Sequence, residues 1–482
     1  MAELFDLAAR EIAAGVRSGE FSALEACEVS LQRIERLNPR LNAVIGYDAE
    51  AARSEAAAVD RRIAAGEALA LAGVPITIKD NLWVGGRRIT QGSRLFADFV
   101  APRDAWAVER LRAHGAVVVG ITNCSEFACK GVSNNLAHGS TLNPWDLRLT
   151  PGGSSGGAAS ATAARFAPLA LGTDAGGSTR RPAAHCGLVG MKPSAGLVPH
   201  PWGFAEPNFG LSVIGQFARD VEDAALMLEC LVGHDTRDQY STRFPGEAGF
   251  REAAALGESV AHGPAAAESR RPPRIAWSAQ LGCGFAIDAD VRAALEAAVG
   301  ALAAEGHAIE AADPQWPRGT AEYPLLALQQ AGLAALYGSE LSARRADIDP
   351  DLVAQIEAGM RVSGAEIARV LLLREAINFA LGEFFERYDL LLCPTAPVTA
   401  WPVGQIGPPQ IGGQPAGPRG HAAFTPLFNY CGVPACSVPV ALVRGLPVGL
   451  QVVAPRYEDA RVLRFAAQVQ GQVNIRFAPD FN

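Results

Sequence analysis

Short runs of β-branched residues, bounded by glycine and proline, constrain the fold of this chain most strongly. Two of them, "LAGVPITIKDNLWV" and "GAVVVGITN", flank "DAWAVERLRAHG", which has helical periodicity. Runs of this kind are typical of buried strands, and the strand–helix–strand order predicts an α/β sheet. Similar runs return late in the chain, in "YDLLLCPTAP", "ACSVPVAL" and "LPVGLQVVAP". The sequence therefore predicts one discontinuous sheet that uses early and late strands, within a single domain over residues 1–482.

Four segments make up this predicted domain. Residues 1–68 have helical patterns, and Ser22 and Glu25 have capping-box spacing. The first strands fall in residues 69–220, whereas residues 240–387 are variable and mostly helical, with a loose connector expected at 245–273. Residues 388–482 supply further strands and a helix that complete the sheet.

Charge and composition exclude several classes of function. The 482 residues carry a net charge of −8, with an isoelectric point near 5.6, which argues against nucleic acid as the main partner. The N-terminus lacks a signal-peptide pattern, and no uncharged apolar stretch reaches the roughly 18 residues of a membrane span. The nine cysteines form no C-x-x-C pair and no metal-ligand spacing. We expect a cytoplasmic protein with reduced thiols, no metal, no cofactor and no membrane partner.

Lys79 is the first of three polar features in apolar or glycine-rich surroundings. It ends the run "VPITIK", where an ordinary lysine would keep its ammonium group in water. A catalytic base would instead need its pKa lowered by roughly three units, or about 4 kcal/mol, which burial at a strand end can supply. The residue alone leaves both interpretations open.

The second feature is the stretch "TPGGSSGGAAS", residues 150–160. Its composition fits a flexible linker, but it lacks the lysine of a phosphate-binding G-x-x-x-x-G-K-[ST] loop and the preceding strand of a dinucleotide fingerprint. Gly152, Ser154 and Gly156 match G-x-S-x-G, yet Pro151 stands where a nucleophile elbow needs a strand, and no later histidine has a suitable context.

The third feature is Ser178, at the end of "GTDAGGS". Two glycines before a serine allow close backbone approach to a ligand, with successive N–H groups pointing one way. Such a turn is able to hold an oxyanion, each well-placed donor contributing about 2.7–4 kcal/mol in the transition state. A tight turn with a capping serine is the simpler alternative.

Together these features resemble the amidase signature family of serine hydrolases. The resemblance is carried by "GVPITIKDN", "PGGSSGGAASA" and "LGTDAGGSTRRPAAHCGLVGMKP". It is dense from about residue 71 to 216 and weaker in the C-terminal strands. It implies the amidase-signature fold, a large mixed twisted β-sheet covered by helices on both faces.

The resemblance also implies roles for individual residues. Ser178 aligns with the nucleophile, Lys79 with the base, and Ser154 with the bridging serine, which follows a cis peptide in the family. The backbone amides that align with the oxyanion hole are those of Ala175, Gly176, Gly177 and Ser178. The residues that align with positions bracing the site are Ser155, Asp174 and Arg180. The implied reaction is hydrolysis of a small carboxylic amide through an acyl-enzyme, releasing ammonia or an amine.

The family leaves alternatives within and outside catalysis. One is the A subunit of a tRNA-dependent amidotransferase. The stretch "TNCSEFA", which contains Glu126, resembles the "DEFA" region of that subunit. Against it, the chain has no tyrosine-rich stretch before "CPTAP", and alanines occupy 422 and 423 where the amidotransferase tends to have an acid. Another alternative is a catalytically silent protein with a binding or assembly role, although the complete set of Lys79, Ser154 and Ser178 speaks against it. The family also allows a homodimer.

The substrate pocket is expected to use variable segments near residues 127–135 and 200–210. Candidate lining residues are Cys129, Gly131, Trp202 and Phe204, with Phe209 as a further part of an apolar wall. Ordinary packing is the alternative for these aromatic residues. Lys130 and Arg374 are candidates for holding a carboxylate, with solvated surface as the simpler interpretation.

Overall fold

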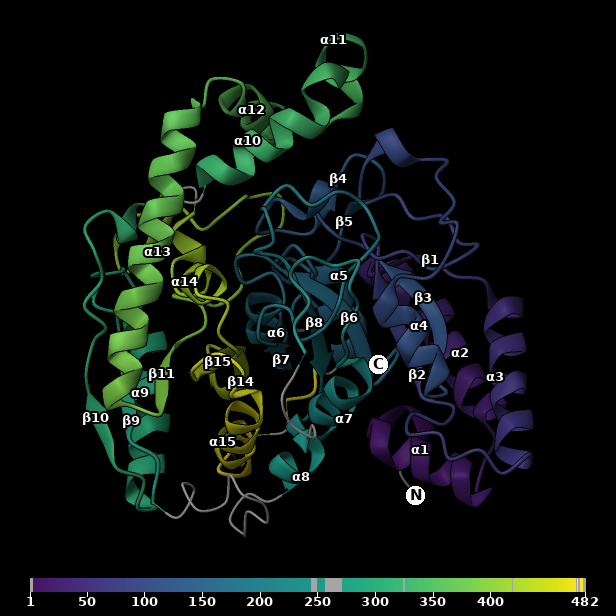
Figure 1. Ribbon diagram of the computed structural model, residues 1–482. Coiled ribbons are helices and arrows are strands. Elements are labelled where there is room, and N and C mark those ends of the chain that lie inside the picture. Colours follow the sequence, from purple (N-terminus) through teal and green to yellow (C-terminus); the bar gives the residue numbers. More distant parts are fainter. Residues whose placement is uncertain are drawn as a thin grey trace.

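An eleven-stranded mixed β-sheet runs through the molecule in the computed structural model (Figure 1). The structure describes residues 3–243, 249–255, 271–323, 326–417, 419–473, 475 and 477–479. The strand order is β1-β3-β2-β6-β8-β7-β14-β15-β11-β9-β10, so that β7 from the first half of the chain pairs with β14 near its end. The predicted α/β class with a large mixed sheet is confirmed.

The elements have the following bounds. The strands of the large sheet are β1 (Val44–Gly46), β2 (Pro75–Lys79), β3 (Val117–Thr122), β6 (Leu169–Asp174), β7 (Val189–Lys192), β8 (Val213–Ala218), β9 (Ile275–Trp277), β10 (Ile309–Ala311), β11 (Leu390–Pro394), β14 (Ala435–Val443) and β15 (Leu446–Val453). Two small hairpins are formed by β4 (Asn134–Asn135) with β5 (Gly139–Ser140), and β12 (Gln410–Ile411) with β13 (Gln414–Pro415). The α-helices are α1 (Ala9–Ser18), α2 (Ala23–Leu41), α3 (Ala49–Ala64), α4 (Trp106–Ala113), α5 (Gly156–Ala163), α6 (Arg180–Cys186), α7 (Val221–Leu231), α8 (Phe250–Ala255), α9 (Ala289–Ala304), α10 (Leu326–Tyr337), α11 (Leu341–Arg344), α12 (Pro350–Gly359), α13 (Gly364–Arg387), α14 (Pro426–Tyr430) and α15 (Asp459–Gly471). Short 3₁₀ helices cover Leu4–Asp6, Arg94–Phe96, Glu126–Ala128, Thr320–Glu322, Gly338–Glu340, Arg345–Asp347 and Gly420–Ala422.

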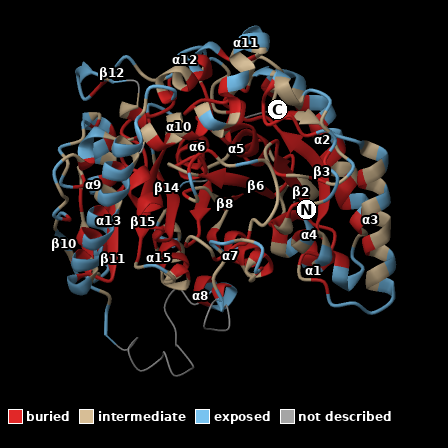
Figure 2. Ribbon diagram, turned by 45° about the horizontal axis from the view of Figure 1, so that its top comes forward, coloured by how far each residue is buried: buried red, intermediate tan, exposed pale blue. Residues whose placement is uncertain are grey.

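Helices cover both faces of the sheet, as the resemblance implied. Helices α5 and α6 pack on one face, against β6, β7, β14 and β15, whereas α7, α8 and α15 lie on the other (Figures 1 and 2). Most of the sheet between them is buried, and exposed residues lie mainly on the outer sides of the helices, in the connecting loops and at the edge strand β10 (Figure 2). Burial on both faces explains why β2, β3, β6 and β11 read as nearly continuous apolar runs.

Most predicted elements form where the sequence indicated. The capping box of α2 is present, because the Ser22 side chain accepts from the Glu25 amide and Glu25 accepts from the Ser22 amide. The helical assignment of residues 1–68 missed β1, a three-residue strand that pairs with the edge of β3. The connector expected at 245–273 falls largely on 244–248 and 256–270, which lie outside the described residues.

The glycine–serine stretch at 150–160 is packed into the interior instead of forming a flexible linker. It leads into α5, all eight of whose residues are buried against β2, β6 and α6. Small side chains are required there: a Cβ on Gly157 would stand 2.4 Å from the carbonyl oxygen of Asn123. The alanine and glycine composition of this segment therefore reflects close packing.

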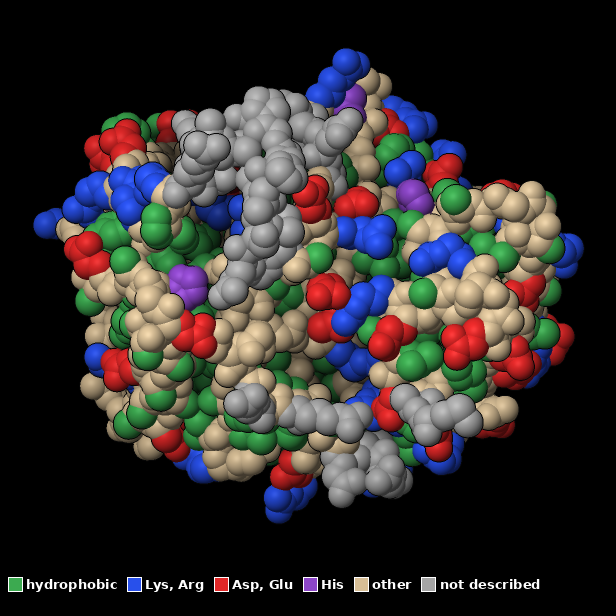
Figure 3. Space-filling view, turned by 90° about the horizontal axis from the view of Figure 1, so that it is seen from below, with side chains coloured by type: hydrophobic (Ala, Val, Ile, Leu, Met, Phe, Trp, Pro, Cys, Tyr) green, Lys and Arg blue, Asp and Glu red, His purple; other side chains and the backbone are tan. Residues whose placement is uncertain are grey.

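The mostly helical segment between β9 and β11 forms the outer part of the molecule. Helix α10 packs against α12 and α13, and these helices extend beyond the end of the sheet (Figure 1). Basic and acidic side chains are interspersed over the face seen from below (Figure 3), so charge on that face is mixed in sign. In the described part of the chain, no helix is both long and apolar enough to cross a membrane.

Candidate active site

Lys79, Ser154 and Ser178 come from three segments that meet at one edge of the sheet. Lys79 is the last residue of β2, and Ser178 follows the end of β6 by four residues. Because β2 and β6 are adjacent parallel strands, their carboxyl ends lie at the same edge. Ser154 lies two residues before the start of α5, which packs against both strands.

Lys79 has a wholly buried side chain whose partners are hydroxyl groups. Its Nζ donates to Ser154 Oγ at 2.8 Å and to Thr173 Oγ1 at 2.8 Å, and it is 0% exposed. Thr173 Oγ1 also accepts from Asn81 Nδ2 at 3.0 Å. Burial lowers the pKa of Lys79 to about 8, because the ammonium form loses its hydration. The interpretation of Lys79 as a solvated strand-end lysine is therefore wrong.

The segment around Ser154 is held by neighbouring backbone and serine groups. The Gly153–Ser154 peptide is cis, as the resemblance implied. The Ser154 carbonyl accepts from Ser133 Oγ at 3.1 Å and from the Ser125 amide at 3.3 Å. Ser155 ties this segment to β6, since its Oγ donates to the Thr173 carbonyl at 3.2 Å. These contacts fix the Ser154 hydroxyl beside Lys79.

Ser178 lies in a tight turn next to the same segment. Its carbonyl accepts from the Ser155 amide at 3.3 Å, and the residue is 7% exposed. Gly177 has a φ of 109°, and a Cβ there would stand 2.0 Å from Thr425 Oγ1, so only glycine fits. Of the four amides predicted for the oxyanion hole, that of Gly177 donates to Asp174 Oδ1 at 2.6 Å. Ala175 and Gly176 are partly exposed.

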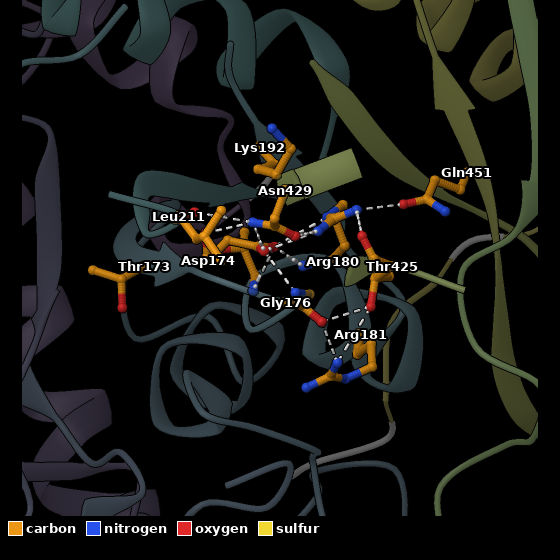
Figure 4. A network of polar contacts seen from close by, with 12 residues as sticks. Thr173, Asp174, Gly176, Arg180, Arg181, Lys192, Leu211, Thr425, Asn429 and Gln451 are labelled. Atoms are coloured by element: carbon orange, nitrogen blue, oxygen red, sulfur yellow. Dashed lines mark hydrogen bonds and ion pairs between the residues drawn. The ribbon is translucent and has the colours of Figure 1, made fainter. Parts of the chain in front are cut away.

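Asp174 and Arg180 form a buried ion pair that fixes this turn (Figure 4). Both side chains are 0% exposed, and Arg180 donates through Nε and Nη2 at 3.0 and 2.9 Å. Asn429 Nδ2 donates to the Asp174 carbonyl, and Gln451 Oε1 accepts from Arg180 Nη1. Burial alone would raise the pKa of Asp174, but the Arg180 guanidinium holds it well below its usual range. Two of the predicted bracing residues thus contact each other directly.

Replacing Arg180 by methionine is expected to lower the free energy of unfolding by about 3–5 kcal/mol, because it leaves the Asp174 carboxylate buried without its counter-ion. Urea unfolding followed by circular dichroism measures this loss. The control is Arg148→Met, because the side chain of Arg148 is 88% exposed and paired with Asp146. This variant should change the free energy of unfolding by less than about 1 kcal/mol. A loss for Arg180→Met as small as the control's would contradict the assigned role.

A cavity of about 510 Å³ opens onto the two serines. Its lining includes Ser154, Ser178 and Ala175 at one end and the predicted Trp202 and Phe204 along its wall. The guanidinium groups of Arg103 and Arg237 each lie over the ring of Trp202, at 4.2 and 4.3 Å from its centroid. Phe204 packs on the rings of Trp83, Phe96 and Phe99.

Other residues predicted for the pocket lie elsewhere. Cys129 and Gly131 are outside the cavity lining, which takes Phe127 and Ala128 from that segment. Both of these have positive φ values, 52° and 59°, and the chain turns there so that Cys129 faces the interior. A Cβ on Gly131 would stand 2.0 Å from His421 Nε2. Phe209 is 47% exposed and is also outside the lining.

The two candidate carboxylate-binding side chains have partners within the protein. Lys130 forms a buried ion pair with Asp349, the N-cap of α12, and so is not a solvated surface residue. Arg374 Nε donates to the Tyr430 carbonyl at 3.0 Å. Glu126 is also buried and accepts from Ser93 Oγ and the Asp349 amide. Lys130 and Glu126 thus both fix the start of α12 against the segment that lines the cavity.

The sequence analysis missed three polar residues close to Lys79 and Ser178. Thr173 and Asn81 contact each other, and Thr173 contacts the lysine, but their proximity depends on the pairing of β2 with β6. Arg181 is 4% exposed, and its guanidinium donates to the carbonyls of Gly153 and Gly176, linking the Ser154 segment to the Ser178 turn. The only sequence signal was its place directly after Arg180 in "STRRPAAH".

Comparisons with known proteins agree with one another on the family. The sequence model of the Amidase family matches residues 25–463. The A subunit of the glutamyl-tRNA(Gln) amidotransferase of Chromohalobacter salexigens is 34% identical, covering 97% of this chain and 96% of that protein. Among solved structures, 6-aminohexanoate cyclic dimer hydrolase complexed with substrate has a TM-score of 0.87 at 28% identity, covering 100% of both chains. A bacterial aryl acylamidase of the amidase signature enzymes has a TM-score of 0.88 at 30% identity, covering 97% of this chain and 96% of its own.

Proposed function

This chain belongs to the amidase family, and we propose that it hydrolyses a small carboxylic amide through an acyl-enzyme formed on Ser178. The observation that carries the proposal is the 2.8 Å contact between Lys79 Nζ and Ser154 Oγ, in a buried site open to the cavity at Ser178. A lysine in this environment is able to act as a base near neutral pH, because burial favours its neutral form.

In the proposed first step, neutral Lys79 accepts the hydroxyl proton of Ser154 while Ser154 accepts that of Ser178. Ser178 Oγ bonds to the substrate's carbonyl carbon, and the oxyanion accepts hydrogen bonds from the amides of Ala175, Gly176 and Ser178. The Gly177 amide is less suited to this role because it donates to Asp174. The proton returns through Ser154 to the leaving nitrogen, and the carbon–nitrogen bond breaks.

The second half of the proposed cycle repeats these transfers with water. A water molecule gives a proton to the Ser154–Lys79 pair and attacks the acyl carbon. The Ser178 oxygen then leaves and takes the proton back, releasing a carboxylic acid. Arg181 supports both halves by holding the carbonyls of Gly153 and Gly176, so that the two catalytic segments keep their spacing.

A second candidate is the A subunit of a tRNA-dependent amidotransferase, acting with protein partners. The sequence comparisons favour it over a free-standing hydrolase, because curated relatives at 34–37% identity over nearly the whole chain bear that name. The structural likenesses to a cyclic dimer hydrolase and an aryl acylamidase support a free-standing enzyme. The alanines at 422 and 423 also support a free-standing enzyme, because the amidotransferase tends to have an acid in this segment. They lie close in sequence to Thr425, whose Oγ1 donates to the Gly176 carbonyl at 2.7 Å.

Ammonium release from a panel of primary amides, measured with the purified chain alone, tests the proposal. The panel contains aliphatic, aryl, indole-acetic, malonamic and urea-type amides and glutamine. We expect turnover of at least one small amide other than glutamine. Failure of the chain alone, combined with glutamine-dependent amidation of glutamyl-tRNA(Gln) once partner proteins are added, would establish the second candidate. Failure to react with a fluorophosphonate would instead indicate a catalytically silent protein with a binding or assembly role.

A further inference from the structure

A group of basic and polar side chains lies beyond Gly176, outside the lining of the 510 Å³ cavity. It consists of Arg181, Tyr323, Arg419 and His421, and we call it the arginine cluster. Tyr323 Oη lies 3.0 Å from the position that a Cβ on Gly176 would take. The guanidinium of Arg419 is 5.7 Å from the centroid of the Tyr323 ring. The cluster therefore adjoins a residue whose amide is one of the proposed oxyanion donors.

The two arginines of the cluster have no acidic partner within the described residues. The neighbouring Arg180 is paired with Asp174, and the buried Lys130 is paired with Asp349. Among the described residues, Arg181 donates to carbonyl and hydroxyl oxygens of Gly153, Gly176 and Thr425. Arg419 donates to Gln355 Oε1 at 3.2 Å. Figure 4 shows Arg181 set apart from the Asp174–Arg180 pair. Positive charge is thus left uncompensated beside the site.

Three nitrogen atoms of the cluster also have no hydrogen-bond partner among the residues that the structure describes. They are Arg181 Nε and both ring nitrogens of His421, and all three are buried. Buried polar atoms of folded proteins almost always have a partner, and an unpaired buried charge is costly. Burial, with the charges of Arg181 and Arg419, lowers the pKa of His421 well below its usual value, so the cluster's charge resides on the guanidiniums.

Access to the cluster is open on the side of Arg419. Arg419, Tyr323 and Gly176 are each partly exposed, whereas Arg181 and His421 are 4% and 2% exposed. A ligand approaching from solvent would therefore meet Tyr323 and Arg419 before the buried Arg181. Arginine and tyrosine donors together match a planar carboxylate, which accepts several hydrogen bonds at once.

We propose that the arginine cluster binds a carboxylate of the substrate, so that the preferred substrates are amides carrying a free carboxylate a short distance from the scissile bond. This inference rests on the proposed amidase function and narrows it. The carboxylate is on the acyl side in monoamides of dicarboxylic acids and on the amine side in N-acyl amino acids. In the proposed binding mode, either kind of substrate has its carboxylate next to Gly176 while the carbonyl of the scissile amide faces Ser178.

Paired substrates and one variant test the proposal. Succinamate is compared with neutral succinamide, and N-acetylglycine with a neutral N-alkyl acetamide of the same length. We expect the wild type to prefer the carboxylate member of at least one pair. Arg419→Gln should lower kcat/KM for that member by about 10- to 100-fold, through KM, while changing the neutral member less than threefold. Tyr323→Phe should give a smaller loss of the same kind.

The matched control is Arg318→Gln, because Arg318 is an exposed arginine five residues before Tyr323 and outside the cluster. It should leave the preference unchanged. Equal or better turnover of the neutral member in both pairs, or an equal loss on both members in Arg419→Gln, would overturn the inference. With Ser178-dependent turnover intact, either result would leave the proposed function standing.

A binding measurement separates failure of the inference from failure of the proposed function. Succinate and N-acetylglycine are titrated calorimetrically into the wild type and into Arg419→Gln, a readout that needs no turnover. We expect saturable binding of at least one to the wild type and at least tenfold weaker binding to the variant. Absence of binding to the wild type, or equal binding to both, would contradict the inference even if no amide in the panel is hydrolysed.

Discussion

Ser178→Ala is expected to reduce amide turnover by about 10⁴-fold or more, because it removes the oxygen on which the proposed acyl-enzyme forms. The variant should also lose covalent labelling by a fluorophosphonate. Ser178 is only 7% exposed and sits in a turn held by the Asp174–Arg180 pair, so removing one hydroxyl should leave the fold intact. Mass spectrometry of the labelled protein and steady-state rates of ammonium release measure the two effects.

The control for this variant is Ser212→Ala, which removes another serine of the same cavity lining without touching the Lys79 contacts. It should keep its label on Ser178 and turn over within a few-fold of the wild type. Full activity or undiminished labelling in Ser178→Ala would place the nucleophile elsewhere. Equal losses in both variants would indicate a change of cavity shape.

Lys79→Met is expected to lower kcat by about 10³-fold or more, because general-base catalysis by the lysine and activation of the nucleophile are lost together. The wild type should show a matching pH dependence. Burial lowers the pKa of Lys79 to about 8, and the neutral amine is the active form. kcat/KM should therefore rise about tenfold per pH unit below pH 8 and level off above it, with about a tenth of the molecules active at pH 7.

The control for the pH profile is Lys192→Met, since Lys192 is a second fully buried lysine and contacts the Pro193 carbonyl instead of the serines. In this variant kcat/KM should still rise with pH below about pH 8, as in the wild type. Loss of this rise in Lys192→Met, or a wild-type profile that is flat from pH 6 to 9, would contradict the role proposed for Lys79. Thermal unfolding of Lys79→Met should show an intact fold, because methionine fills a similar volume without a buried charge.

The sequence predicted most of the sheet because its strands are marked locally. Buried strands such as β2 and β11 are short apolar runs with glycine or proline nearby, and the capping box of α2 is a local pattern as well. β1 escaped notice because three residues are too few for periodicity, and only pairing with β3 makes them a strand. The interior position of Gly157 was equally hidden, since it depends on an approach to Asn123.

At the site, the sequence placed Lys79, Ser154 and Ser178 through a family resemblance, and their roles stay predictions. What it could not supply were contacts between segments far apart in the chain. Thr173 reaches Lys79 only because β2 pairs with β6, and Arg181 reaches Gly153 only because α6 packs against α5. Cys129 was misplaced for a backbone reason, the left-handed residues at 127 and 128, which no composition argument reveals.

The pairing of β7 with β14 has a consequence for how the protein is made. β7 ends at Lys192 and β14 begins at Ala435, so a ribosome translating about 5–20 residues per second needs roughly 12–50 s to supply the missing neighbour. Throughout that interval the edge of β7 that pairs with β14 in the folded protein has no partner strand. An unpaired apolar strand edge favours aggregation, so the nascent chain needs shielding until β14 emerges. Loss of β14 and β15 would therefore remove two strands from the middle of the sheet and not from its edge.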